Sequence, residues 1–481
     1  MKDMMNKAIA AACLCLMAAQ AASAKITLPD IFSDNMVLQQ QAEARLWGWS
    51  EPGMEVSVAT SWNGKTYHTT SDGGGKWTLS VATPAASYEP QTVTVADNDG
   101  TVTLSNVLIG EVWFCSGQSN MEMPLAGFDN CPIEGANEAI ATAARWKGVR
   151  MATVEKNGQL KPVDRCRGKW QTCNPETAPR FSATAFFFAT MLNRALDVPV
   201  GIINCSWGGT MVEGWLPRDT VAKYPDIDLE RDIRKEEPHP WWHYLSPTLM
   251  YNGMLHPLAG YTIKGFLWYQ GESNVGKHAT YAQRLNTMVS LWRKEFGQGC
   301  LPFYFVEIAP YGTCEGNASA FLREAQHRAQ RLVENSAMTS TNDLVEPYEA
   351  GNIHPKDKRS VGSRLAYLAL AKTYGMKGVE ADCPEYEKME VRGDTVLLSF
   401  THADNGFSRM GGFVGFEVAG ADRVFHAAEA ALCGKNQIRV TCPEVKQPVA
   451  VRYAFHDYSP GNVKNLRGLP LVPFRTDDWS E

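Results

Sequence analysis

The chain has 481 residues, of which 44% are hydrophobic and 20% are charged, and its formal net charge at pH 7 is −6. A chain of this length is expected to fold into more than one domain. Because the charge is mildly acidic and no block of basic residues stands out, nucleic acid is not an expected partner.

The first 24 residues have the pattern of a secretory signal peptide. Lys2 and Lys7 give a basic start, residues 8–19 are apolar, and residues 22–24 (Ala-Ser-Ala) form a small-x-small cleavage site. The apolar stretch is shorter than the roughly 20 residues of a membrane-spanning helix, and no later stretch is long enough. We therefore expect residues 1–24 to be removed, the protein to be exported to the periplasm or secreted, and no association with a membrane.

Several of the twelve cysteines lie where export would permit disulfide bonds. Cys131, Cys166 and Cys173 fall in a loop-rich region where a bridge is plausible, although the pairing does not follow from sequence. Cys115 and Cys205 lie in apolar, strand-like runs, and we predict that they are buried thiols.

Residues 25–105 alternate polar and apolar positions over short runs. The clearest runs are Ala44–Trp49, Glu55–Ala59 and Trp77–Val81, and turn sequences such as Asn63-Gly64 separate them. Period-two alternation broken by such turns predicts antiparallel strands. We expect a small N-terminal β-sandwich domain over residues 25–105.

The pattern changes over residues 106–378, where apolar runs alternate with helical segments. Strands are predicted at 107–115, 199–206, 263–270, 301–308 and 336–341, and helices at 181–196, 280–296, 319–335 and 355–374. Strand–helix alternation predicts an α/β domain with a parallel sheet covered by helices on both faces. Residues 218–260 do not fit this alternation and are interpreted as an insertion near the site. Residues 379–481 return to alternation and predict a C-terminal β region.

Ser119 is the candidate nucleophile. The apolar run that precedes it ends in Gly117-Gln118-Ser119-Asn120, which predicts a buried strand that presents a serine on a tight turn. Such a serine needs a turn to expose it and a base to take its proton, and its own N–H could face a developing oxyanion. The α/β-hydrolase elbow requires a second glycine at position 121, which is methionine here. Ser116 is a rival nucleophile, but it lies closer to the strand.

Two further motifs follow predicted strands. Gly209 lies in the Gly-Gly turn after the second strand, and its N–H is a candidate oxyanion donor. Gln270 and Asn274 follow the third strand and are the candidate side-chain donors, while Glu272 between them could contact substrate. Reactive residues of parallel sheets lie at the carboxyl ends of the strands, so the motifs are expected to share one site.

His354 is the candidate base. It precedes a predicted helix that begins at Pro355, and the positive end of that helix would keep the imidazole neutral. His239 and His243 are four residues apart, but Pro240 lies between them and a third ligand is missing, so we predict no metal site. No organic cofactor is expected either.

These motifs resemble those of the sialate O-acetylesterase family, within the SGNH/GDSL-like hydrolases. The resemblance rests on four ordered blocks and a closing segment, and it covers nearly all of the chain after residue 24. The matching segments are Gly110–Leu125 (GEVWFCSGQSNMEMPL), Ser206–Thr210 (SWGGT), Trp268–Asn274 (WYQGESN), Ile353–Lys358 (IHPKDK) and Gly468–Trp479 (GLPLVPFRTDDW).

The resemblance implies a flavodoxin-like, three-layer α/β/α esterase core flanked by β-sandwich regions. It implies that Ser119 is the nucleophile, His354 the base, and Gly209 with Gln270 or Asn274 the oxyanion donors. Many relatives carry Asp two residues before the histidine, where this chain has Asn352. An asparagine does not stabilise an imidazolium as a carboxylate does. Asp343 or a nearby glutamate could supply the acid, or a backbone carbonyl could orient the ring of a Ser–His dyad.

We therefore expect an exported serine esterase that removes O-acetyl groups from a sugar or glycan. Sialic acid is the expected substrate because the family takes its name from it. Acetylated xylan is the main alternative, since the fold does not specify the sugar. A carbohydrate-binding protein with a degenerate hydrolase core is the non-enzymatic alternative, and intact Ser119 and His354 argue against it. The sequence leaves the acetyl position and the oligomeric state open.

Overall fold

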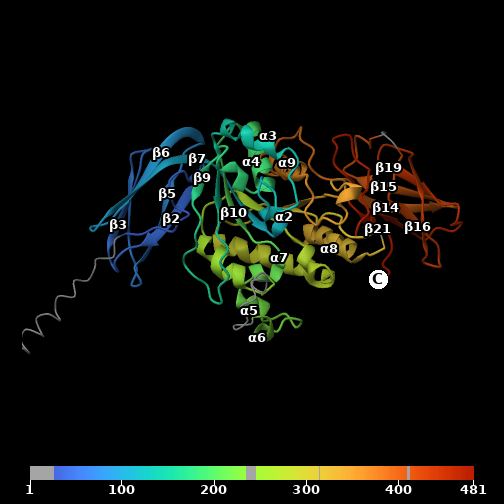
Figure 1. Ribbon diagram of the computed structural model, residues 1–481, viewed down its shortest axis with the longest axis horizontal. Coiled ribbons are helices and arrows are strands. Elements are labelled where there is room, and N and C mark those ends of the chain that lie inside the picture. Colours follow the sequence, from blue (N-terminus) through green and yellow to red (C-terminus); the bar gives the residue numbers. More distant parts are fainter. Residues whose placement is uncertain (1–25, 234–244, 314, 409–411, 481) are drawn as a thin grey trace, which may run out of the picture.

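The computed structural model describes residues 26–233, 245–313, 315–408 and 412–480. Three parts follow one another along the long axis: a β region, a central α/β region and a second β region (Figure 1). The expected signal peptide and the pair His239 and His243 lie outside the described residues. Within those residues, no helix combines the length and apolar character needed to cross a membrane.

The N-terminal part is built from antiparallel strands, as the alternation predicted. One sheet contains β3 (Glu55–Thr60), β4 (Thr66–Thr70) and β6 (Ser87–Ala96), and a second pairs β2 (Glu43–Trp49) with β5 (Lys76–Ala82). Alternate side chains of both sheets contribute to one buried cluster, which holds Val56 and Val58 from β3 and Trp77 from β5. Burial of these alternate residues holds the two sheets together.

Strand β7 (Thr101–Gly117) runs through two parts of the molecule. Its first half pairs with β6, its middle pairs with β1 (Val37–Gln39), and its second half enters the central sheet. The domain boundary that we expected between residues 105 and 106 therefore falls inside one continuous strand.

The central sheet has the strand order β13-β12-β11-β7-β10-β8-β9. Its predicted strands are β10 (Val200–Ser206), β11 (Gly265–Tyr269), β12 (Phe303–Val306) and β13 (Ser336–Thr339). Together with β7 these strands are parallel and have the 2-1-3-4-5 order of flavodoxin-like folds, which confirms the expected core. The edge strands β8 (Val149–Thr153) and β9 (Trp170–Thr172) were not anticipated from sequence.

Helices cover both faces of this sheet (Figure 1). On one face α4 (Ala183–Leu196) packs against α9 (Lys358–Leu368), and on the other α7 (His278–Phe296) packs against α8 (Ala318–Leu332). The side chains of successive residues of β7 point to opposite faces of the sheet: Trp113 belongs to the buried cluster under α4, and Phe114 belongs to the buried cluster under α7.

Short helical segments complete the central part. Besides α2 (Ser119–Glu122), three helices of four to six residues lie between the main elements, and two of these fall inside the expected insertion 218–260. Two π-helical turns are also present. The three helices are α3 (Ala136–Ala141), α5 (Arg218–Val221) and α6 (Leu229–Asp232), and the turns are Tyr251–Leu255 and Ala369–Thr373. The last turn continues α9, so the helical segment reaches residue 373 as predicted.

The C-terminal part contains two four-stranded antiparallel sheets with the orders β14-β15-β19-β18 and β17-β16-β20-β21. The strands are β14 (Glu385–Arg392), β15 (Thr395–Thr401), β16 (Phe416–Ala419), β17 (Phe425–Ala427), β18 (Glu429–Leu432), β19 (Gln437–Thr441), β20 (Ala450–Tyr453) and β21 (Phe474–Arg475). One buried cluster, with Leu398 from the first sheet and Val451 from the second, joins them as a sandwich.

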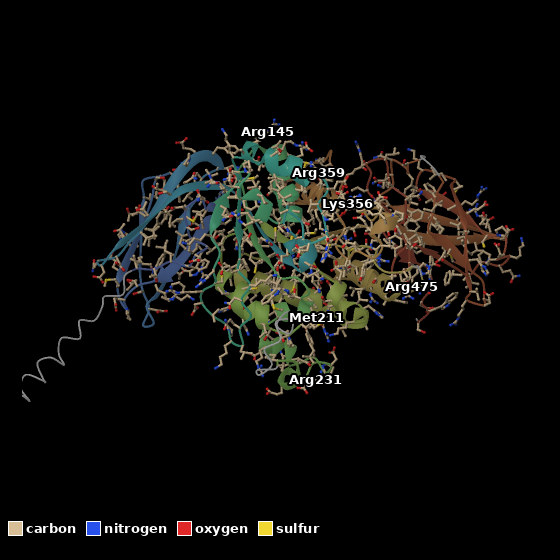
Figure 2. All side chains as sticks on the ribbon, in the orientation of Figure 1. Arg145, Met211, Arg231, Lys356, Arg359 and Arg475 are labelled. Carbon is tan, nitrogen blue, oxygen red and sulfur yellow. The ribbon has the colours of Figure 1, made fainter. Side chains whose placement is uncertain are left out.

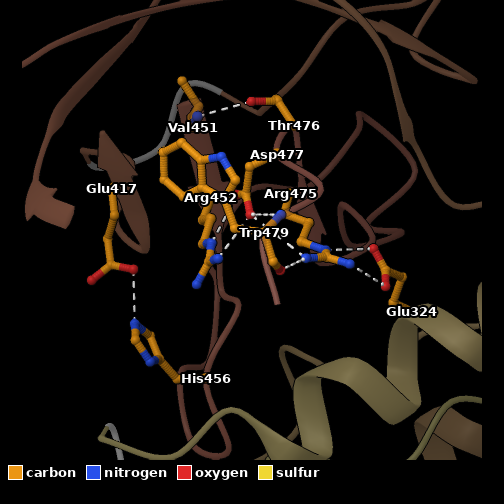
Figure 3. Close-up of polar contacts among 9 residues, drawn as sticks. All are labelled: Glu324, Glu417, Val451, Arg452, His456, Arg475, Thr476, Asp477 and Trp479. Atoms are coloured by element: carbon orange, nitrogen blue, oxygen red, sulfur yellow. Dashed lines mark hydrogen bonds and ion pairs between the residues drawn. The ribbon is translucent and has the colours of Figure 1, made fainter. Parts of the chain in front are cut away.

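Arg475 fastens this sandwich to the central part. It lies at the junction with α8 (Figure 2), where it makes two hydrogen bonds of 2.8 and 3.1 Å to Glu324 (Figure 3). Behind it, Asp477 accepts two hydrogen bonds from Arg452, at 2.9 and 2.8 Å. These paired charges anchor the segment Gly468–Trp479.

The structure corrects the expected disulfide. Cys131, Cys166 and Cys173 are free thiols, as are all the other cysteines in the described ranges. Cys115 and Cys205 are fully buried, which confirms the prediction for these two.

Candidate active site

Three strand ends meet at one edge of the central sheet. In the register of the sheet, Gly117 at the end of β7 lies beside Ser206 of β10 and beside Tyr269 of β11. The motifs that follow these strands are therefore brought together, as the strand–motif pattern predicted.

Ser119 is the first residue of the short helix α2 (Ser119–Glu122). The turn before it depends on Gly117, whose φ is +136° and where a Cβ would lie 2.1 Å from the Tyr269 carbonyl oxygen. Ser119 is half-buried, whereas the rival Ser116 is fully buried inside β7. The structure thus exposes Ser119 and not Ser116.

His354 lies against Ser119. The distance between Ser119 Oγ and His354 Nε2 is 2.8 Å, within hydrogen-bonding range. The Phe128 ring packs edge-on against the imidazole, with 5.3 Å between ring centroids. Residues 235 positions apart in the chain are therefore placed as a nucleophile and a base.

The imidazole is held neutral, although not by a helix terminus. Burial, helped by the charge of Lys358, lowers the pKa of His354 to about 4. The helix expected to begin at Pro355 begins at Lys358, and its N-cap is Asp357, whose side chain accepts a hydrogen bond from Ser360 N–H. The lowered pKa agrees with the expected neutral imidazole, but its main cause is desolvation.

Two buried side chains hold the backbone around His354. Asn120 Nδ2 donates to the Ile353 carbonyl at 3.0 Å, and Lys358 Nζ donates to the Pro355 carbonyl at 2.7 Å. Lys358 also donates to Asn120 Oδ1 at 2.7 Å, so the two clamps are linked. Burial lowers the pKa of Lys358 to about 7, against the opposing charge of Glu272.

Glu272 belongs to this network. Its Oε1 accepts a 2.6 Å hydrogen bond from Asn120 Nδ2, and its Oε2 is buried. Burial raises the pKa of Glu272, although the Asn120 hydrogen bond and the Lys358 charge oppose that rise. One carboxylate oxygen is therefore bonded inside the site, whereas Oε2 has no hydrogen-bond partner among the described residues, and the contact with substrate stays a prediction.

Gly209 is placed as an oxyanion donor would be. It has φ +78°, its carbonyl accepts a 2.8 Å hydrogen bond from Ser273 Oγ, and its N–H has no acceptor among the described hydrogen bonds. The adjacent Gly208 lies against the nucleophile, since a Cβ there would be 3.2 Å from Ser119 Cβ. Gly208 N–H is occupied by Glu122 at 2.5 Å, whereas the N–H groups of Gly209 and Ser119 have no acceptor among the described hydrogen bonds and are candidate backbone donors.

The amides of Gln270 and Asn274 are directed away from the oxyanion. Gln270 Nε2 donates to the Thr210 carbonyl at 3.0 Å and to Asn274 Oδ1 at 2.7 Å. Asn274 Nδ2 donates to both oxygens of Glu213, at 3.3 and 3.0 Å. Both side chains are fully buried, so we correct their predicted role: they fix the loop that carries Gly209.

Asp343 is not brought to the imidazole. Its Oδ1 and Oδ2 accept hydrogen bonds of 2.8 and 2.7 Å from Arg364, and Lys464 Nζ lies 2.6 Å from Oδ2. Burial would raise the pKa of Asp343, but the hydrogen bonds and charges of Arg364 and Lys464 hold it below its usual value. Asp343 is thus a structural carboxylate that ties the central part to the C-terminal sandwich, and its predicted role as triad acid is corrected.

Asn352 and Cys131 surround the other side of the imidazole. Asn352 Oδ1 accepts a 2.9 Å hydrogen bond from His354 N–H, and Asn352 Nδ2 donates to the His354 carbonyl at 3.0 Å. Cys131 Sγ lies 3.4 Å from Asn352 Oδ1 and 3.9 Å from His354 Nδ1. Sequence reasoning missed this thiol, because the turn that carries it is more than 200 residues from His354 in the chain.

A cleft opens beside the pair Ser119 and His354. It has a volume of about 340 Å³, and two of its lining residues, Glu122 and Phe128, contact the site. Its other walls include Val154, Pro179, Lys156 and Arg180. Within the described residues, no cluster of three or more His, Cys, Asp or Glu side chains suited to a metal ion occurs.

Comparisons with known proteins agree with this geometry. A family model described as carbohydrate esterase, sialic acid-specific acetylesterase, matches residues 109–371. The sialate O-acetylesterase of Rattus norvegicus is 28% identical over 77% of this chain and 78% of its own length, and that of Homo sapiens is 27% identical over 81% and 79%. The crystal structure of a carbohydrate acetylesterase from Xanthomonas citri is 32% identical, with a TM-score of 0.84 over 94% of this chain and 100% of that chain.

The lowered pKa of His354 predicts an unusually acidic lower limit of activity. Since only the neutral imidazole accepts the serine proton, kcat/KM should stay constant from neutral pH down to about pH 5 and fall about tenfold per pH unit below about 4. A pH profile with a chromogenic acetate ester measures this, with circular dichroism at each pH as the control for unfolding. Half-maximal kcat/KM near pH 6.5 would contradict the desolvated environment of the ring.

Asp343→Asn should destabilise the protein and leave catalysis nearly intact. Removing the carboxylate leaves the buried Arg364 guanidinium without its counter-charge, which should lower the free energy of unfolding by about 3 kcal/mol. Because the folded pKa is lowered, this stabilisation is present above the unfolded pKa of about 3.9 and is lost as pH falls below it. Denaturant unfolding at pH 7 and near pH 3, with kcat of the folded variant, measures both; a kcat loss of about 10⁴-fold would restore Asp343 as the acid.

Proposed function

Because the chain belongs to the sialic acid-specific acetylesterase family of carbohydrate esterases, we propose that it removes O-acetyl groups from sialic acid, with Ser119 as the nucleophile. The observation that carries this proposal is the 2.8 Å contact between Ser119 Oγ and the neutral His354 Nε2. A carboxylic ester hydrolase of this kind needs an activated serine and an adjacent donor for the oxyanion, and both lie at the same edge of the sheet.

The reaction follows from these positions. His354 Nε2 takes the proton of Ser119 as Oγ attacks the acetyl carbonyl, and the N–H groups of Ser119 and Gly209 stabilise the resulting oxyanion. The imidazolium then protonates the departing sugar oxygen, which leaves an acetyl group on Ser119. Water, deprotonated by the same nitrogen, releases acetate and regenerates the serine.

The charge of the cleft supports an acidic sugar. Lys156 Nζ pairs with Glu122 Oε1 at 2.7 Å, so these two lining charges offset each other. Arg180 is exposed at the cleft, and its guanidinium has no ion pair or hydrogen bond among the described residues. A guanidinium binds a carboxylate through two parallel hydrogen bonds. Sialic acid carries such a carboxylate, whereas the backbone sugars of acetylated xylan, the alternative substrate, do not.

We also propose that the protein is exported and that residues 1–24 are removed. The basic start, the apolar stretch and the Ala-Ser-Ala site of the sequence support this proposal. The intact mass of the protein isolated from its host checks it, because a processed chain would begin at Lys25.

Ser119→Ala should abolish acetate release without unfolding the protein. Loss of the nucleophile from a positioned serine–histidine pair reduces kcat by about 10⁴-fold or more. The measurement is acetate released from O-acetylated sialic acid and from a chromogenic acetate ester, with Ser116→Ala as the matched control. Near-normal turnover by folded Ser119→Ala would refute the assignment of Ser119 as the nucleophile.

Arg180→Gln should weaken the binding of acidic sugars selectively. We expect KM for O-acetylated sialic acid to rise about tenfold, because one charge-assisted contact is lost. The KM values for acetylated xylo-oligosaccharides and 4-nitrophenyl acetate should stay unchanged. Arg145→Gln is the matched control, since Arg145 is exposed and lies outside the cleft lining (Figure 2). Equal KM values for wild type and Arg180→Gln on sialic acid would contradict the assignment and favour a neutral sugar.

A further inference from the structure

The Nδ1 side of His354 faces a thiol where a serine triad has a carboxylate. Cys131 Sγ lies 3.9 Å from Nδ1, and the carboxylate of Asp343 is occupied by Arg364 and Lys464. We propose that Cys131 is a positioning residue for His354, with its sulfur accepting the Nδ1–H hydrogen bond. This proposal rests on the proposed role of His354 as the base.

The direction of the hydrogen bonds follows from the Asn352 amide. Its Oδ1 accepts from His354 N–H and its Nδ2 donates to the His354 carbonyl, so the orientation of the amide is determined by the backbone of His354. Oδ1 is therefore an acceptor toward Cys131 as well, and the thiol can donate its hydrogen to it over 3.4 Å. With the thiol hydrogen on Oδ1, the sulfur lone pairs are left for the imidazole, and a hydrogen bond between the two groups then requires the hydrogen on Nδ1.

This arrangement selects the productive tautomer of the imidazole. With hydrogen on Nδ1, the lone pair of Nε2 points to Ser119 Oγ at 2.8 Å and can take its proton. When Nε2 becomes protonated, the hydrogen bond from Nδ1–H to the sulfur is kept. Cys131 therefore orients the base without receiving a proton.

The turn at residues 128–131 carries both Phe128 and Cys131, which contact the His354 imidazole. Cys131 N–H donates to the Phe128 carbonyl at 2.9 Å, and Phe128 N–H donates to the Cys131 carbonyl at 3.0 Å. Phe128 packs against one edge of the imidazole while Cys131 meets Nδ1. Because these hydrogen bonds fix the backbone of Cys131, only the rotation of its short side chain is restricted when the thiol contacts the ring, so even a weak hydrogen-bond acceptor can bias the tautomer.

A neutral acceptor also agrees with the electrostatics of the site. A carboxylate beside Nδ1 would favour the imidazolium and raise the pKa of His354. Burial and Lys358 instead lower that pKa, and no acidic side chain of the described residues opposes them. The imidazole is thus oriented by the dipole of the Cys131 thiol and is not stabilised by the charge of a carboxylate.

The tautomer of the wild-type enzyme is the direct test. In protein labelled with ¹⁵N-histidine, the His354 resonances, assigned by their loss in His354→Gln, should show hydrogen on Nδ1 and a free Nε2 at pH 7. Hydrogen on Nε2 would overturn the proposal. Because this measurement requires no turnover, its failure is distinguishable from a failure of the proposed function, which Ser119→Ala tests.

Substitutions of Cys131 provide the second test. In Cys131→Ala we expect both tautomers to be populated and kcat to fall about tenfold with KM unchanged, as for the loss of one neutral hydrogen bond. Cys131→Ser keeps a group that donates and accepts and should retain most of kcat. Cys131→Asp places a charge beside Nδ1 and should move the acid limit of kcat/KM upward by about one pH unit or more.

Cys433→Ala is the matched control, because Cys433 is an exposed free thiol in the C-terminal sandwich. It should leave kcat, KM and the histidine resonances unchanged. Thermal unfolding of each variant separates a loss of fold from a loss of orientation. A folded Cys131→Ala enzyme with wild-type kcat and a single Nδ1–H tautomer would overturn the proposal.

Discussion

Parallel pairing of β7 with β10 on one side and β11 on the other is the constraint on which the site depends. The backbone hydrogen bonds of these three strands fix their register, so that Ser206 and Tyr269 end level with Gly117. The turn at Gly117 leaves no room for a Cβ, because the Tyr269 carbonyl lies against it. The nucleophile, the Gly209 loop and the Glu272 loop are consequently held by the sheet itself.

The second constraint is a buried polar network beneath the nucleophile. Lys358, Asn120 and Glu272 are joined in series, and two of them also bind the carbonyl groups on either side of His354. In a low-dielectric interior such a network is strong when every member has a partner. It couples the serine turn to the histidine loop, so that the positions of nucleophile and base depend on each other.

Charged side chains have different roles in different parts of the molecule. Two sets of ion pairs, those of Asp343 with Arg364 and Lys464 and of Arg475 with Glu324, join the C-terminal sandwich to the central part. On the Nδ1 side of the imidazole, by contrast, the contacting side chains are Asn352 and Cys131 and include no carboxylate. The reacting pair therefore sits in a desolvated pocket with an exposed cation, Arg180, in the wall of the adjoining cleft.

Local periodicity accounts for much of the fold. Five of the six parallel strands of the central sheet, the four main helices and both β regions follow from alternation and helical spacing, because these patterns arise from neighbouring residues. Ser119, Gly209 and His354 were identified for the same reason: each follows a recognisable strand or precedes a helix. The edge strands β8 and β9 were missed, since they lie in a loop-rich segment and are stabilised by pairing to β10 and to each other.

The sequence did not determine which side chains meet when they are far apart in the chain. Nothing local shows that Gln270 and Asn274 turn inward toward Thr210 and Glu213, or that Asp343 meets Arg364. Lys358 and Asn120 lie inside the quoted motifs, and their nearness to His354 and Ser119 was a signal that could have identified them. Cys131 gave no such signal. Its place beside His354 arises only when two loops from different parts of the chain close over the end of β7, which tertiary packing alone decides.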